Sequence, residues 1–447
     1  MLTDVFVPHN RWDLLDRYPL PTPSISVVIV HFEQHAQLDR TCRALAAQTS
    51  LPLEVIVADD GSSHPPNPSA GGVPVRVVAQ RDLGFRAAAA RNLGAARATG
   101  EVLVFLDADT TPEPGFLAAI TRTVARCPDA LAVGRREHGD FTDVPLDADP
   151  RTARRLPPPE WLEREYARSQ DLLHADGRSF RFVISAVLAC RASLFHELGG
   201  FDERFVEYGG EDWDLAYRAW NRGAVLVRER AAVAWHDGPD WAGRAAAADS
   251  LDAQAIRLAA LVPEPHTRGA PLPADLPDVL VDLAEGTDTT RTTHSLLNQT
   301  FRDLRVRLPA DTPPHVADLY GANVHRGAWT PDQLRRCRAR LTASAPLHPS
   351  AVETAMAALV DGDLGTVELV DGPSTVATLT GNRCLGRAHR WRRRFDATEV
   401  ADLFGTAVLP GGSPIRQDTA VDQYFSASSE HRPPAPVPGP GPGVRSG

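Results

Sequence analysis

Short apolar runs alternate with stretches of helical period over the first half of the chain. Four mostly apolar runs each predict a strand: residues 25–30 (ISVVIV), which has the pattern of a buried strand, and residues 55–58, 75–79 and 102–106 (VLVFL). Because segments of helical character separate these runs, the order predicts an α/β domain with a mainly parallel sheet.

The helices between these strands have their own signals. Leu38, Cys42 and Leu45 recur at helical spacing after the first run. An Ala/Arg-rich stretch over about 85–98 predicts a second helix, which we expect Gly100 to terminate. After the fourth strand, Thr111-Pro112 has the form of a helix cap followed by a first-turn proline, so a further helix is expected to begin there.

The character of the chain changes further along. Residues 137–160 are polar and rich in proline, which indicates an inserted loop. After Gly243, segments of helical period are broken by prolines. We therefore predict an N-terminal extension (1–23), an α/β domain (24–243), a mainly helical accessory region (244–425) with a short β element over 366–379, and a disordered Pro/Gly-rich tail (426–447).

Composition excludes several classes of chemistry. The 447 residues contain no lysine, so Schiff-base chemistry and the phosphate-binding loop with its Lys are excluded. The net charge of −10 argues against a general nucleic-acid binder. No apolar run is long enough for a membrane span, and the five scattered cysteines suit a reducing cytoplasm, where we expect the protein to be.

Two acidic motifs follow predicted strands. Asp59-Asp60-Gly61-Ser62 comes at the end of the second strand, where an acid can accept a hydrogen bond from a nucleobase or ribose, although the same letters also suit an ordinary turn. Asp107-Ala108-Asp109 follows the fourth strand, and two carboxylates there can hold Mg²⁺ or Mn²⁺ on a diphosphate. The similar Asp147-Ala148-Asp149 follows no strand, and we interpret it as a decoy.

Two further motifs lie between residues 209 and 237. Gly209-Gly210-Glu211-Asp212-Trp213-Asp214 opens a predicted helix, with an Asp214–Arg218 pair one turn apart. Acids there can face a ligand or simply complement the helix dipole, and the paired glycines favour the first interpretation. Trp235-His236-Asp237 follows an apolar run, and a lone histidine in such a place is more often structural than a metal ligand.

The order of these motifs resembles that of a known family. The stretch RDLGFRAAAARNLGAARATGEVLVFLDAD (81–109) is similar to chondroitin-polymerase-type transferases. The stretch GGFDERFVEYGGEDWDLAYRAWNRG (199–223), with AWHD after it, is similar both to those enzymes and to the β-1,4-galactosyltransferases. Residues 24–238 thus resemble a GT-A-fold, family 2-type glycosyltransferase. The resemblance implies an NDP-sugar donor, most often UDP-linked, and an inverting transfer to an acceptor that the sequence does not identify.

By the same resemblance, the motif residues have expected roles. Asp60, with Asp59 beside it, would contact the nucleobase, and Asp107 the ribose or metal. Asp109 and His236 would bind Mn²⁺ or Mg²⁺. Asp212 would be the catalytic base, with Glu211 and Trp213 near the acceptor.

Several alternatives stay open at this stage. Arg86 and Arg91 would be further cations for the diphosphate, or lie on a solvated helix face. Residues 387–394 are rich in arginine and include a partial match to the Gln-x-x-Arg-Trp motif of processive synthases. These arginines would bind an anionic acceptor or a lipid surface, or would lie on a solvated helix face. A sugar nucleotidyltransferase or a catalytically silent nucleotide-sugar-binding protein is the rival function.

Overall fold

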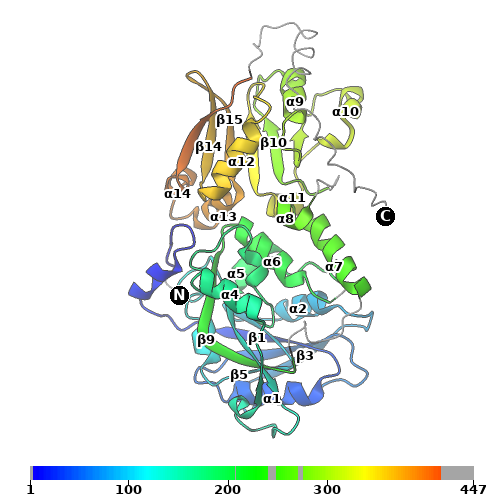
Figure 1. Cartoon of the computed structure of the whole chain (residues 1–447). Coiled ribbons are helices and arrows are strands. Elements are labelled where there is room, and N and C mark those ends of the chain that lie inside the picture. Colours follow the sequence, from blue (N-terminus) through cyan, green and yellow to red (C-terminus); the bar gives the residue numbers. More distant parts are fainter. Residues whose placement is uncertain (1–3, 207, 240–247, 270–274, 414–447) are drawn as a thin grey trace, which may run out of the picture. The chain divides into compact units, whose positions relative to one another are not determined.

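The computed structural model describes residues 4–206, 208–239, 248–269 and 275–413. The chain divides into two compact units. The N-terminal unit comprises residues 1–278 together with 329–338 and 381–405, and the second unit comprises 279–328, 339–380 and 406–447 (Figure 1). The division therefore falls after Asp278 and not after Gly243, and the chain returns twice to the N-terminal unit. The predicted tail lies outside the described residues.

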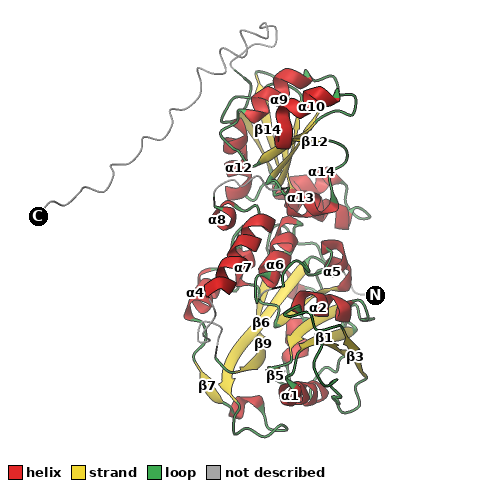
Figure 2. Ribbon diagram, turned by 90° about the vertical axis from the view of Figure 1, so that its right-hand side faces the viewer, coloured by secondary structure: helices red, strands yellow, loops and turns green. Residues whose placement is uncertain are grey.

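A nine-stranded sheet forms the centre of the N-terminal unit. Its strands are β1 (Ile25–His31), β2 (Glu54–Asp59), β3 (Val75–Ala79), β4 (Val102–Asp107), β5 (Thr110–Pro112), β6 (Ala130–Asp140), β7 (Arg154–Leu156), β8 (Val187–Arg191) and β9 (Val225–Asp237). The order is β3-β2-β1-β4-β8-β6-β9-β5, with β7 on β6. The first four strands pair in parallel, as predicted, and β9 runs parallel to β6 (Figure 2).

The N-terminal unit also contains helices, drawn red in Figure 2. They are α1 (His35–Ala46), α2 (Ala87–Ala95), α3 (Phe116–Ile120), α4 (Glu160–Arg168), α5 (Ala192–Leu198), α6 (Glu211–Asn221), α7 (Ala248–Leu261), α8 (Pro265–Arg268), α11 (Pro331–Arg336), α13 (Asn382–Trp391) and α14 (Ala397–Phe404). Short 3₁₀ turns are η1 (Trp12–Arg17), η2 (Pro150–Thr152) and η3 (Ser179–Phe182). The apolar residues of the predicted first helix, such as Leu38 and Cys42, are buried on α1.

Two local predictions are wrong. Thr111-Pro112 does not start a helix, because these residues form β5 and pair with β9, a partner more than a hundred residues away. Gly100 does not cap α2, which ends at Ala95. Instead, Gly100 lies so close to Ser26 that an added Cβ would be 2.6 Å from the Ser26 nitrogen.

The cluster of arginines on α13 is largely structural. The Arg387 side chain is fully buried and donates to the carbonyls of Val7 and His9, which places the N-terminal extension against α13. Arg390 and Trp391 donate to the buried carboxylate of Asp129. Neither the lipid-binding nor the solvated interpretation therefore holds for these residues, although residues 392–394 are exposed.

The second unit corrects the prediction of a mainly helical accessory region. It contains a seven-stranded sheet in the order β12-β11-β10-β13-β15-β14-β16. The strands are β10 (Val279–Leu283), β11 (Leu304–Arg307), β12 (Val324–His325), β13 (Ala339–Ala343), β14 (Thr366–Asp371), β15 (Ser374–Gly381) and β16 (Thr406–Pro410), and the helices are α9 (Thr289–Leu297), α10 (Pro314–Tyr320) and α12 (Ala351–Asp361), with the turn η5 (Gly321–Asn323).

Alternation of strands and helices makes the second unit α/β as well. The expected β element over 366–379 is confirmed as the β14–β15 hairpin. The other strands are short, and their partners are distant in sequence, which is why helical periodicity dominated the sequence pattern. Among the described helices, none is both long and apolar enough to cross a membrane.

Candidate active site

A cavity of about 450 Å³ opens at the carboxyl ends of β1, β2 and β4 in the N-terminal unit. Strand register explains why the acidic motifs meet there: Asp59 pairs with His31, and Asp107 pairs with Val30. Ligands of open α/β sheets bind at this edge. The cavity brings together seven residues that the sequence singled out, which are Asp60, Arg91, Asp107, Asp109, Glu211, Asp212 and His236.

The two aspartates after β2 differ in their surroundings. Asp59 accepts hydrogen bonds from His31 Nδ1 (2.7 Å) and from the Ser62 hydroxyl (2.6 Å). Burial would raise the pKa of the Asp59 carboxyl, but these hydrogen bonds hold it below its usual value. Asp60 faces the cavity and accepts from Gln80 Nε2 (2.5 Å) and from the backbone N–H of Arg86 (2.8 Å). Asp59 thus fixes the turn, and Asp60 is the acid available to a ligand.

Arg91 on α2 joins two of the candidate carboxylates. Its guanidinium donates to Asp107 Oδ1 at 2.7 Å and to Glu211 Oε1 at 2.9 Å. Burial would lower the pKa of Arg91, but the two carboxylates hold it above its usual value. The Arg91 side chain is only 4% exposed, which excludes the solvated interpretation. The second oxygen of Glu211, Oε2, is buried in the cavity wall without a hydrogen-bond partner.

Asp109 and His236 meet because β5 pairs with β9. The register places Thr110 opposite His236, and His236 Nδ1 lies 3.2 Å from Asp109 Oδ1. Gln34 donates to the other oxygen of Asp109 at 2.9 Å. Asp107 is held instead by Arg91, and the described residues contain no group of three or more His, Cys, Asp or Glu side chains set to hold a metal. Of the predicted ligands, Asp109 and His236 are therefore the pair in contact.

The segment at the N-terminus of α6 also lines the cavity, through Gly209, Glu211 and Asp212. Gly209 and Gly210 both have positive φ, and a Cβ on Gly210 would lie 2.8 Å from the ring of Phe205, so the paired glycines are required by the shape of this loop. The pKa of Asp212 is raised to about 7, mainly by burial and to a smaller extent by the neighbouring Glu211 carboxylate. A carboxyl with this pKa can take up and release protons near neutral pH.

Three of the predicted site residues, Asp59, Arg86 and Trp213, do not line this cavity, and neither does Asp149 of the motif interpreted as a decoy. Arg86 contributes its backbone N–H to Asp60, while its side chain reaches toward Gln80 (3.4 Å). Trp213 lines a second cavity, next to the first. Asp149, of the decoy motif, caps η2 and pairs with Arg151.

Sequence reasoning missed several cavity residues. His31 is the last residue of β1 and Gln34 comes three residues later, and this position at the carboxyl end of a parallel strand was a usable signal. Asp82, Arg136 and Tyr208 also line the cavity, but no motif marked them.

Two family models match the N-terminal half of the chain. Residues 26–199 match the model of the family described as glycosyl transferase family 2, and residues 171–234 match that of the N-terminal domain of galactosyltransferase. The resemblance to family 2 glycosyltransferases is confirmed. The GT-A-type α/β fold that this family implied agrees with the sheet of the N-terminal unit.

The match to individual proteins is partial. The chain is 30% identical over 234 residues to a validoxylamine A glucosyltransferase of Streptomyces hygroscopicus subsp. limoneus, covering 46% of this chain and 50% of that protein. It is 26% identical over 239 residues to a chondroitin synthase of Pasteurella multocida, covering 48% of this chain and 25% of that protein. Among solved structures, GalNAc-T7 with UDP, GalNAc and Mn²⁺ is similar at a TM-score of 0.38 and 19% identity, covering 57% of this chain and 52% of that one. The chain thus spans half or less of the length of these curated relatives.

Proposed function

We propose that the protein is a metal-dependent inverting glycosyltransferase that moves a sugar from an NDP-sugar, most simply a UDP-sugar, to an acceptor hydroxyl. The observation that carries the proposal is that one cavity is lined both by a carboxyl with a pKa of about 7 and by an Asp–His pair in contact. A nucleotide-sugar-binding protein without catalysis would not need the first of these groups.

Asp212 is the proposed general base. An inverting transfer is a single displacement at the anomeric carbon, so the acceptor hydroxyl must lose its proton as the new bond forms. Asp212 Oδ1 accepts the backbone N–H of Trp213 at 2.8 Å, which orients the carboxylate. Glu211 Oε2 is available to accept from a sugar hydroxyl, because Arg91 occupies only Oε1.

Asp109 and His236 are the proposed metal ligands, and the residues present fit a divalent ion. Six carboxylates line the cavity (Asp60, Asp82, Asp107, Asp109, Glu211 and Asp212) against two guanidinium groups (Arg91 and Arg136). Such an excess of negative charge opposes entry of a diphosphate unless a cation accompanies it. A bound Mn²⁺ or Mg²⁺ would relieve the charge of the departing diphosphate, and a site with few protein ligands suits an ion that shares its shell with phosphate oxygens.

Removal of divalent ions is expected to abolish transfer, and Mn²⁺ is expected to restore it. Asp109→Asn should raise the Mn²⁺ concentration needed for half-maximal UDP binding by roughly tenfold or more. Isothermal titration with UDP at several Mn²⁺ concentrations measures this without relying on turnover. The matched control is the double variant D147N/D149N, which should behave as wild type. Full activity in excess chelator, or a large effect of the control, would refute the assignment.

The transfer rate is expected to fall below neutral pH. Because the pKa of Asp212 is raised to about 7, the unprotonated base is lost as pH falls through that value. At saturating Mn²⁺ and donor, kcat should decrease about tenfold for each pH unit below 7 and be level above it. A rate that stays level down to pH 5.5 would contradict the raised pKa as the controlling ionisation.

A further inference from the structure

A second cavity, of about 440 Å³, lies beside the candidate active site and is unlike it in charge. Three arginines, two acids and three aromatic side chains line it: Arg168, Arg178, Arg181, Glu165, Asp176, Trp161, Phe182 and Trp213. We call it the arginine pocket. All its residues belong to α4, to η3 and the segment before it, or to α6, within the N-terminal unit.

The guanidinium groups of the arginine pocket are not equally engaged. Arg168 pairs with Glu165 at 2.8 Å. Asp176 accepts from the backbone N–H of Arg178 (3.0 Å) and from the Ser179 hydroxyl (2.9 Å). Among the described residues, no carboxylate lies within ion-pairing distance of Arg178 or Arg181, whose Nε donates only to a backbone carbonyl at 3.4 Å. Arg178 is exposed and Arg181 is half-buried, so both guanidinium groups are free to pair with an anionic ligand that enters the cavity.

The aromatic side chains give the arginine pocket an apolar wall. The rings of Trp161 and Phe182 lie 6.4 Å apart, and Trp161 is 44% exposed. Trp213 adds a third, partly buried ring from α6. A flat aromatic surface packs against the C–H face of a saturated ring, while guanidinium groups fix the orientation of its charged substituent. The size of the cavity suits a ligand of one or two rings.

Two chain segments connect the arginine pocket with the proposed base. Trp213 lines the pocket, and its backbone N–H donates to Asp212 Oδ1 at 2.8 Å. Phe182 also lines the pocket, and Ser185, three residues later, lines the donor cavity together with Asp212. The arginine pocket and the cavity that holds the proposed base are therefore bordered by the same two chain segments.

We propose that the arginine pocket is the acceptor subsite and that the acceptor is a hydroxylated ring compound bearing a carboxylate or a phosphate ester. This proposal rests on the proposed function, since it is Asp212 that makes a neighbouring ligand an acceptor. Arg178 and Arg181 bind the anionic group, and the wall of Trp161, Phe182 and Trp213 holds the ring with a hydroxyl toward Asp212. The net charge of the ligand, more than its ring stereochemistry, sets its affinity.

The test compares three probes with the full-length protein: glucuronate, glucose 6-phosphate and glucose. Binding is measured by NMR titration in metal-free buffer, so that phosphate cannot bind through a cation. We expect both anions, or one of them, to bind at least about tenfold more tightly than glucose. The tighter of the two identifies a carboxylate or a phosphate as the preferred group. Equal affinity for all three probes would overturn the proposal.

Variants locate the binding and separate it from the donor site. The double variant R178Q/R181Q should lower the affinity for the anionic probe to that for glucose, whereas R164Q, an exposed arginine of α4 outside the pocket, should not. Unchanged selectivity in R178Q/R181Q would overturn the proposal, and its thermal unfolding midpoint checks that it folds. A separate titration of the wild type with UDP in the presence of Mn²⁺ tests the proposed function. Anion selectivity without UDP binding would refute the proposed function alone, and UDP binding without anion selectivity would refute the arginine pocket alone.

Discussion

Asp212→Asn is expected to reduce glycosyl transfer by roughly 10³-fold while leaving Mn²⁺-dependent UDP binding close to that of the wild type. The amide keeps the shape of the side chain and can still accept the Trp213 N–H, but it cannot take the proton of an acceptor hydroxyl. The loss should appear in kcat, measured under saturating donor. Turnover close to wild type in this variant would remove Asp212 from the role of base.

The same variant is expected to be more stable than the wild type above pH 7. Asp212 has an ordinary pKa of 3.8 when unfolded and one of about 7 in the folded protein, so the folded state binds more protons between these values. Stability therefore falls as pH rises from about 4 to 7, and the penalty is constant above that range. Asp212→Asn removes this penalty, which the pKa difference limits to roughly 4 kcal/mol. An inactive variant that is also less stable at pH 8 would indicate disruption of the site and not loss of a base.

Local sequence signals predicted the part of the fold that carries the donor cavity. Four apolar runs identified β1 to β4, and because the carboxyl ends of parallel strands share one edge, the motifs after β2 and β4 could be expected to meet. The paired glycines before Glu211 likewise indicated a shaped loop, which the positive φ of both residues confirms. These features depend on a few consecutive residues, so one sequence is sufficient to find them.

Features that depend on distant partners could not be predicted in this way. Thr110–Pro112 form a strand only because β9 lies beside them, and the helix-cap pattern there was misleading. For Arg91 and Arg390 a solvated position stayed open as an alternative, because their carboxylate partners, Glu211 and Asp129, are more than a hundred residues away in the sequence. The arginine pocket was missed for a related reason, since its members carry no shared motif and meet only when α4, η3 and α6 pack together.

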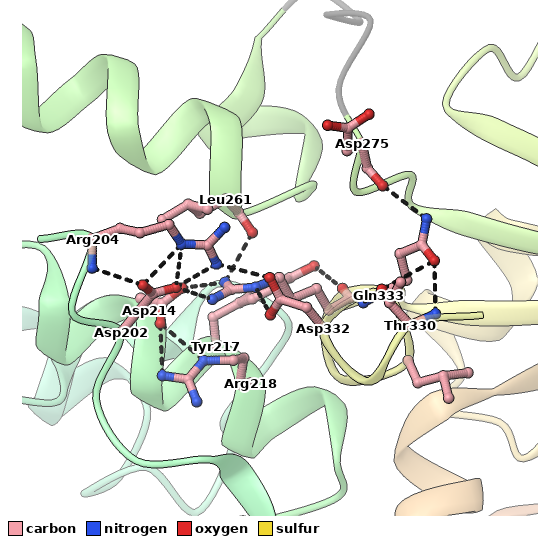
Figure 3. A network of polar contacts seen from close by, with 12 residues as sticks. Asp202, Arg204, Asp214, Tyr217, Arg218, Leu261, Asp275, Thr330, Asp332 and Gln333 are labelled. Atoms are coloured by element: carbon pink, nitrogen blue, oxygen red, sulfur yellow. Dashed lines mark hydrogen bonds and ion pairs between the residues drawn. The ribbon is translucent and has the colours of Figure 1, made fainter. Parts of the chain in front are cut away.

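A network of buried charges supports α6, the helix that carries the proposed base (Figure 3). Arg336 of α11 is almost completely buried and pairs with Asp214 in the first turn of α6, with Asp202 at 2.6 Å and with Asp332 at 2.7 Å. It also donates to the carbonyl of Leu261 at 3.1 Å. Asp214 is fully buried, and its other partner is Arg218, at 2.7 Å. Arg336 is therefore the cation that joins three acidic side chains from separate segments of the N-terminal unit.

Arg336→Met is expected to destabilise the N-terminal unit by about 3–5 kcal/mol, because it leaves buried carboxylates without their shared cation. Urea unfolding followed by tryptophan fluorescence measures this, since Trp213 and Trp220 lie on α6. The matched control is Arg335→Gln, one residue earlier. Arg335 forms no ion pair among the described residues, so this variant should lower the free energy of unfolding by less than about 1 kcal/mol. A loss in Arg336→Met no larger than that of the control would mean that Arg218 alone neutralises Asp214. Because the network fixes the first turn of α6, the transfer rate should fall in parallel with stability, in contrast to Asp212→Asn, where activity is lost and stability rises.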